Sequence, residues 1–88
     1  MEVFRTNRFK KDVERSIARH NSPERLKKVI GMLKNGEKLP KAYKDHSLQG
    51  NYKDTRECHI KPDWLLIYSI EGDILRLVRT GTHADLFE

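Results

Sequence analysis

The run WLLIYSI at residues 64–70 constrains the fold of this 88-residue chain more than any other feature, because it is apolar on both faces of an extended strand. Successive residues of a strand point to opposite sides of a sheet, so this run needs cover on both sides and belongs at the centre of a sheet. The segments 52–60 and 74–80 flank it, separated from it by a Lys-Pro turn at 61–62 and by a hairpin turn that contains Gly72. The three segments therefore predict antiparallel strands.

Two amphipathic helices precede these strands. One is predicted over residues 7–20, and the other from Ser22, a good N-cap, to Asn35-Gly36, a typical helix end. Their apolar stripes recur at helical spacing and consist of Phe9, Val13 and Ile17 in the first helix and Leu26, Val29, Ile30 and Leu33 in the second. Residues 2–6 predict a short strand, and residues 37–51 a long loop.

The order β-α-α-β-β-β predicts a single α+β domain over residues 1–88, in which an antiparallel sheet of about four strands packs on the two helices. The residues after the last strand, 81–88, are predicted to form a tail. A domain of this size removes only about 60–65% of its unfolded surface from water, so it builds one modest core. We therefore expect any functional site to be an open surface groove.

The charge of the chain is divided unevenly between its halves. Residues 1–45 hold 13 Lys or Arg and 6 Asp or Glu, a net charge of +7, whereas residues 46–88 hold 5 and 7, a net charge of −2. A strongly basic half favours a polyanionic partner, and nucleic acid fits best. The alternative is an ordinary solvated surface.

The cellular location can also be inferred. No apolar run approaches the roughly 18–20 residues that span a bilayer, and the first residues lack the apolar core of a signal peptide, so no membrane association is expected. Cys58 is the only cysteine, which rules out an internal disulfide and favours a reducing cytoplasm.

Three of the four histidines, His46, His59 and His83, lie outside the predicted helices, and Asp63 follows His59 by four residues. Imidazole gives or takes a proton near neutral pH. RNA cleavage needs a base for the ribose 2′-OH, an acid for the leaving 5′-oxygen and a cation for the charge that grows on phosphorus. The His and Asp residues suit the first two needs, while His20 is interpreted as an ordinary residue at a helix end.

Other interpretations of these residues stay open. Any single histidine is more often an ordinary polar residue, and a metal site is disfavoured because the paired spacing of typical ligands is missing. For the cation, Arg79 or Arg56 is available, and Arg79 is expected on the open face of the sheet because a charge is rarely buried unpaired. Cys58 and His59 are neighbours on one strand and point to opposite faces, so they do not form a nucleophile–base pair.

Two aromatic residues are ambiguous. Trp64 begins an apolar strand and either packs in the core or stacks on a base at the edge of a basic groove. Phe87 lies next to the end of the chain, where a core position is harder to arrange.

The segments LPKAYKDHSLQGNYKDTRECHIKPDWLLIY and RTGTHADLF make the sequence resemble the YafQ branch of the RelE/ParE toxin superfamily. The resemblance is dense over residues 39–87, whereas the residues before them match the family only in the layout of their predicted elements. It implies a RelE-like fold with a small antiparallel sheet backed by two N-terminal helices. It also implies a toxin of a bacterial type II toxin–antitoxin system that cleaves mRNA on the ribosome without a cofactor. Its expected partners are an antitoxin, the ribosome and mRNA, and operator DNA only as the toxin–antitoxin complex.

The resemblance also assigns site residues. Those expected to be catalytic are His46, His59, Asp63, Arg79 and His83, and those expected to bind substrate are Trp64, Phe87, Lys44 and Arg56. Ser47 departs from the family pattern, because relatives often have proline there. Two rival functions remain: a ParE-like toxin that acts on DNA gyrase without cutting RNA, and a non-catalytic RNA- or ribosome-binding module. Which residue is the acid and which the base is left open.

Overall fold

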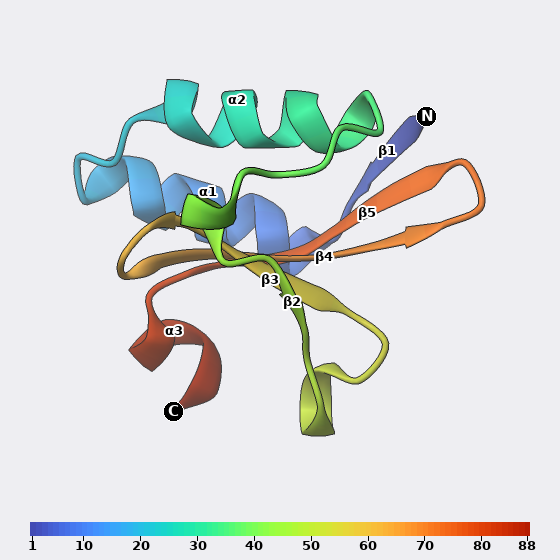
Figure 1. Cartoon of the computed structure of the whole chain (residues 1–88). Coiled ribbons are helices and arrows are strands. Elements are labelled where there is room, and N and C mark those ends of the chain that lie inside the picture. The colour runs from blue at the N-terminus through green and yellow to red at the C-terminus, as the bar shows by residue number, and fades with distance from the viewer.

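In the computed structural model, which describes residues 1–88, helices cover one face of a five-stranded sheet (Figure 1). The elements in chain order are β1 (Glu2–Arg5), α1 (Asn7–Ala18), α2 (Pro23–Lys34), β2 (His46–Ser47), β3 (Arg56–Lys61), β4 (Trp64–Glu71), β5 (Ile74–Gly81) and α3 (His83–Phe87). Short 3₁₀ turns lie at Lys41–Tyr43 and Gly50–Tyr52. No helix is long and apolar enough to cross a membrane.

The sheet has the order β1-β5-β4-β3-β2, so β4 lies at its centre as predicted. Three features differ from the prediction. The sheet is mixed, because β1 pairs with β5 in parallel, while the other neighbouring strands are antiparallel. The fifth strand is β2, which lies inside the segment predicted to be a loop. The predicted strand 52–60 begins only at Arg56, because a 3₁₀ turn and the left-handed backbone of Asp54 (φ 68°) precede it.

Capping explains where the two long helices begin. The Thr6 hydroxyl oxygen accepts a hydrogen bond from the Phe9 N–H at 3.0 Å and donates to the Val78 carbonyl at 2.7 Å, which ties the start of α1 to β5. Ser22 occupies the N-cap position of α2 without a side-chain cap bond, and Pro23 is the first helical residue. The chain leaves α2 through Gly36, whose φ of 75° suits glycine.

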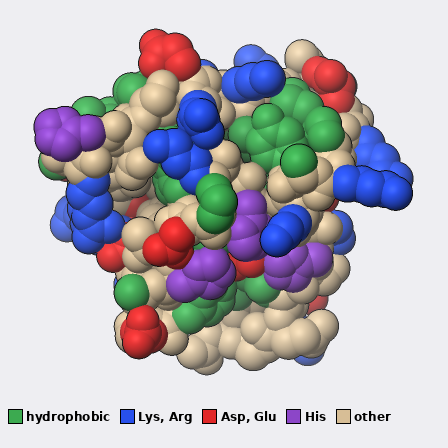
Figure 2. Space-filling view, turned by 60° about the vertical axis from the view of Figure 1, so that its left-hand side comes forward, with side chains coloured by type: hydrophobic (Ala, Val, Ile, Leu, Met, Phe, Trp, Pro, Cys, Tyr) green, Lys and Arg blue, Asp and Glu red, His purple; other side chains and the backbone are tan.

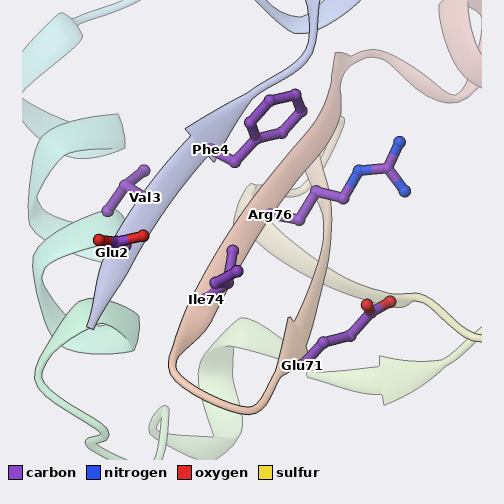
Figure 3. Close-up of a pocket in the computed structure, with 6 residues that line it drawn as sticks. All are labelled: Glu2, Val3, Phe4, Glu71, Ile74 and Arg76. Carbon is purple, nitrogen blue, oxygen red and sulfur yellow. The ribbon is translucent and has the colours of Figure 1, made fainter.

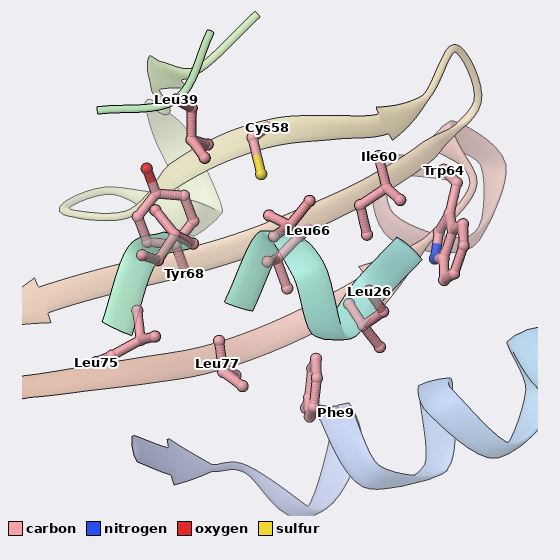
Figure 4. Close-up of a cluster of buried hydrophobic side chains, with 12 residues drawn as sticks. Phe9, Leu26, Leu39, Cys58, Ile60, Trp64, Leu66, Tyr68, Leu75 and Leu77 are labelled. Atoms are coloured by element: carbon pink, nitrogen blue, oxygen red, sulfur yellow. The ribbon is translucent and has the colours of Figure 1, made fainter. Parts of the chain in front are cut away.

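The core lies between the helices and the sheet (Figure 4). Its 12 buried residues are Phe9, Leu26, Val29, Leu33, Leu39, Cys58, Ile60, Trp64, Leu66, Tyr68, Leu75 and Leu77. On the opposite face of the sheet, Leu65 and Ile67 of β4 pack against Leu86 of α3. Residues 64–69 of the apolar run are therefore buried on both faces, whereas Ile70 is exposed, and the second face is covered by only one turn of helix and nearby side chains.

Candidate active site

His46, His59 and His83 come together as a row of rings. The ring centroids of His46 and His59 are 6.4 Å apart, and those of His59 and His83 are 5.8 Å apart. Figure 2 shows three histidine side chains gathered on one face of the molecule, close to Lys and Arg side chains. His20 follows the end of α1 at an exposed position outside this row.

Strand pairing explains the row. His46 of β2 lies opposite Glu57 of β3, and His59 follows Glu57 by two residues, so it shares the same face of the sheet. Leu65 of β4 pairs with His59 on one side and with Gly81 of β5 on the other. The chain continues from Gly81 into α3, whose first residue is His83.

His83 is held by Asp63. The Nδ1 atom of His83 lies 2.7 Å from Oδ1 of Asp63, and the backbone N–H of His83 donates to the same oxygen at 2.9 Å. These two interactions hold the pKa of Asp63 below its usual range. Because an ionised carboxylate only accepts hydrogen bonds, Nδ1 carries the proton of this contact, and Nε2 is left for a substrate. Both side chains are more than half exposed.

Glu57 is a site residue that the sequence analysis missed. Its side chain is only 6% exposed, and its Oε2 atom lies 3.2 Å from Nε2 of His46 and 3.5 Å from Nε2 of His59. The other ring nitrogens face backbone carbonyls: Nδ1 of His46 is 2.7 Å from the Lys44 oxygen, and Nδ1 of His59 is 3.3 Å from the Pro62 oxygen. The alternation of β3 would have indicated Glu57, two residues before His59 on the same face.

Arg79 pairs with Ile67 of β4, and its Nη1 lies 3.5 Å from the Tyr52 hydroxyl, so its side chain points to the face that the two long helices leave open, as expected, but it is buried there in an ion pair. The residue is 7% exposed, its Nε donates to Oδ2 of Asp12 at 2.6 Å, and its Nη2 donates to Oδ1 at 3.0 Å. Asp12, which is 2% exposed, also accepts from the Thr80 N–H at 3.2 Å and raises the pKa of Arg79. The charge is buried because it has a partner on α1, which the sequence analysis did not identify.

The comparisons with known proteins decide the family. A family model matches residues 1–88, and its description is "Bacterial toxin of type II toxin-antitoxin system, YafQ". The chain belongs to the YafQ toxin family. The mRNA interferase toxin YafQ of Escherichia coli strain K12 is 45% identical over 87 residues, which are 98% of this chain and 95% of the relative.

Solved structures agree with the family assignment. The crystal structure of YafQ from E. coli strain BL21(DE3) matches this YafQ-family toxin with a TM-score of 0.95 and 41% identity, covering 99% of this chain and 98% of that one. The crystal structure of the E. coli DinJ–YafQ complex matches with a TM-score of 0.91 and 42% identity, with the same coverage of both chains.

The two aromatic residues of this YafQ-family toxin differ in access. Trp64 is 3% exposed, belongs to the core and donates from Nε1 to the Thr80 hydroxyl at 2.9 Å, so the expectation that it stacks on a base is not met. Phe87 is 46% exposed and lies edge-on to Tyr52 at a centroid distance of 5.5 Å, with the His83 ring at 6.4 Å. Of these two aromatic residues, Phe87 is therefore the one that a bound base can reach.

The expected substrate-binding cations are exposed. Arg56 donates from Nε to Asp45 at 3.2 Å and from Nη1 to the Ser47 hydroxyl at 3.1 Å, and Asp45 raises the pKa of Arg56. Lys44 has a left-handed backbone, and its carbonyl faces His46. Lys44 therefore lies next to His46, whereas Arg56 pairs with Tyr68 and points to the opposite face of β3 from Glu57 and His59.

The short helix α3 positions two site residues, His83 and Phe87. A helix of five residues is not stable alone, so contacts with the rest of the domain must hold it. Thr82 and Asp85 form a capping box at its start. Arg19, the C-cap residue of α1, donates to Asp85 at 2.6 Å and holds the pKa of Asp85 well below its usual range. The Tyr52 hydroxyl donates to the Leu86 carbonyl at 3.1 Å.

Cys58 is not placed to act as a thiol nucleophile. Cys58 is fully buried on the helix-covered face, and burial raises the pKa of its thiol to about 12. No three His, Cys, Asp or Glu side chains have the geometry of a metal site. His46, His59 and His83, with Asp63 and Glu57 beside them, are side chains able to transfer protons.

Two hollows of the surface differ in their chemistry. His59 and His83 line an open groove of about 570 Å³, which agrees with the expected surface groove. A hollow of about 500 Å³ at the β1–β5 end of the sheet is lined by Phe4, Ile74 and Arg76, among others (Figure 3). The Arg76 guanidinium carbon lies 5.9 Å from the centroid of the Phe4 ring. This second hollow contains no histidine, so the candidate active site is assigned to the groove at His59 and His83.

Proposed function

We propose that this YafQ-family toxin is a ribosome-dependent mRNA endoribonuclease that inhibits translation by metal-independent acid–base cleavage. One observation carries the proposal: the His83–Asp63 pair lies beside a second imidazole, His59, on the open side of the domain. The printed name of the E. coli relative, mRNA interferase toxin, agrees with it.

The proposed reaction requires two proton transfers. The ribose 2′-oxygen attacks the adjacent phosphorus, and its proton passes to a base. The bond between phosphorus and the 5′-oxygen breaks as an acid protonates that oxygen, which leaves a 2′,3′-cyclic phosphate. No water and no metal ion are consumed. Each proton transfer by a positioned side chain typically contributes roughly 10²–10⁴ in rate.

His83 is the proposed acid and His59 the proposed base. Asp63 fixes the tautomer and orientation of His83, and protonated Nε2 then donates to the 5′-oxygen. Asp63 itself is a poor base, because its bonds with His83 lower its pKa. His46, linked to His59 through Glu57, is proposed to contact the phosphate or relay a proton.

The proposed partners follow from charge and from the family. The E. coli relative is crystallised with DinJ, and we propose that an antitoxin likewise binds this toxin, with operator DNA contacted only by that complex. The exposed side chains of Lys10 and Lys11 on α1 and of Lys27 and Lys28 on α2 are proposed to contact ribosomal RNA in the cytoplasm. A ParE-like action on gyrase needs no His/Asp cluster, and a pure binding module would leave the cluster without a role.

Induced expression followed by primer extension on a reporter mRNA tests this function. We expect growth arrest, relief by the neighbouring antitoxin and discrete cuts within translated frames. Intact mRNA with blocked replication would favour the gyrase alternative, and ribosome binding without cuts would favour the binding module.

Metal independence needs a separate test. The purified toxin is treated with a chelator and then returned to ribosomes that retain magnesium. Unchanged cleavage is expected. Stoichiometric zinc in the protein, with cleavage lost on its removal, would contradict the proposal.

A further inference from the structure

A cationic groove extends from the histidine row toward α2. Besides His59 and His83, it is lined by Arg25, Tyr43, Lys44 and Lys61. A smaller hollow of about 280 Å³ adjoins it, shares Arg25 and Tyr43 with it, and adds Lys28. The two hollows therefore form one groove, which we call the α2 groove, between the start of α2, the 3₁₀ turn at Lys41–Tyr43 and the turn after β3.

The α2 groove contains cations without acidic partners. None of its lining residues is Asp or Glu, and Arg25, Lys28, Lys44 and Lys61 take part in no ion pair. By contrast, Arg15, Arg19, Arg56 and Arg79 each face a carboxylate. Four unpaired positive charges around one hollow repel one another, and a polyanion that enters the hollow relieves this repulsion.

Tyr43 makes the groove suitable for a nucleic acid strand as well as for an isolated anion. Its half-buried ring borders both hollows, and its hydroxyl has no protein partner among the hydrogen bonds of the structure. Aromatic side chains between phosphate-binding cations are the usual arrangement of single-strand binding surfaces. Phe87 does not line the groove and lies on the other side of His83, next to Tyr52.

We propose that the α2 groove binds the RNA nucleotides on one side of the scissile phosphate, while Phe87 contacts a base on the other side. Arg25, Lys44 and Lys61 contact successive phosphates, and Tyr43 stacks on a base. This assignment rests on the proposed function, because it places the scissile phosphate between His59 and His83. It adds the path of the strand, which the histidines alone do not define.

The test measures binding of a short single-stranded RNA whose scissile ribose is 2′-deoxy, so that it cannot be cleaved. Fluorescence anisotropy over a salt series compares Arg25→Ala/Lys61→Ala with Lys34→Ala/Lys38→Ala, a control that removes the same charge from exposed residues outside the groove. The groove variant should bind at least about tenfold more weakly, and its salt slope should fall by about 1.4, because each lost phosphate contact contributes roughly 0.7. The control should change both quantities little.

Tyr43 gives an independent test. Tyr43→Phe should keep RNA affinity, whereas Tyr43→Leu, which retains the apolar contacts of the ring with the core, should lower affinity without changing the salt slope. Thermal unfolding of each variant separates lost binding from lost folding.

The outcomes distinguish this inference from the proposed function. Equal losses in the groove and control variants, with cleavage of mRNA by the wild type, overturn the groove assignment and leave the nuclease intact. No RNA binding by the wild type at any salt concentration also overturns it. Loss of antitoxin binding with RNA binding unchanged makes the groove an antitoxin surface and overturns it too. Absence of mRNA cleavage on ribosomes by the wild type is the result that removes the proposed function itself.

Discussion

Asp12→Ala should destabilise the domain more than any surface substitution. Asp12 accepts hydrogen bonds from Nε and Nη2 of Arg79, from the Thr80 N–H and from Arg15 at 2.8 Å. Removing the carboxylate leaves the Arg79 guanidinium, whose side chain is only 9% exposed, without its partner. It also leaves the buried Thr80 N–H without its acceptor on Asp12. Breaking a buried ion pair in this way costs about 3–5 kcal/mol.

That cost is large for a chain of 88 residues. At roughly 0.05–0.15 kcal/mol per residue, the free energy of unfolding should be about 4–13 kcal/mol. In a domain of this size 1 kcal/mol corresponds to roughly 4–8 °C in Tm, so Asp12→Ala should lower Tm by about 12–40 °C.

Urea unfolding and calorimetry measure the effect, with Glu14→Ala as the control. Glu14 lies on the same helix, is exposed and has no ion pair, so its substitution should stay within about 0.5 kcal/mol. A loss below about 1 kcal/mol for Asp12→Ala would refute the reasoning, because Arg79 would then have found other partners or water.

The same pair decides whether Arg79 takes part in catalysis. Asp12→Leu/Arg79→Met replaces both charges by apolar side chains of similar size, which is typically neutral or stabilising. If Arg79 has only a structural role, single-turnover cleavage by the folded double variant should stay within about tenfold of the wild type. A loss of more than about a hundredfold, the scale of a direct catalytic contact, would return Arg79 to the site.

Three further predictions follow from the contacts of α3 and Cys58. Arg19→Ala should speed amide exchange at His83 and slow cleavage severalfold. It should change Tm little, because Arg19 is half exposed. Unchanged amide exchange at His83 would contradict this prediction. Arg19 lowers the pKa of Asp85 in the folded state. Ionised Asp85 therefore stabilises the fold above its unfolded pKa of roughly 4, and this stabilisation is lost as the pH falls. Asp85→Asn should accordingly flatten the fall of Tm between about pH 4 and pH 2. A thiol reagent should label Cys58 only in denaturant, because burial raises its pKa to about 12; rapid labelling of the native protein would contradict this burial.

The fold was predictable where the sequence repeats a period. The helical stripes predicted α1 and α2, and the doubly apolar run placed β4 at the centre of the sheet. The two-residue strand β2 is too short to show a period, and the parallel pairing of β1 with β5 depends on contacts between the two ends of the chain. The helix α3 is also short, although Thr82 and Asp85 at capping-box spacing would have indicated its start.

The candidate site was predictable only in part, because its residues are joined by tertiary contacts. The turn after β3 keeps Asp63 near His59, but the pairing of β2 with β3 brings His46 to the same row. The burial of Arg79 was not predicted because its partner, Asp12, lies 67 residues away in the chain. Trp64 was ambiguous until its N–H was found bonded to a core threonine.

Single-turnover cleavage by His83→Ala at matched ribosome occupancy tests the central claim most directly. Because His83 is the proposed acid, the variant should fold, bind ribosomes and antitoxin, and cut mRNA at least about a hundredfold more slowly than the wild type. His20→Ala, outside the row of histidines, should cut at the wild-type rate. Equal rates for the two variants would contradict the account and remove His83 from the mechanism.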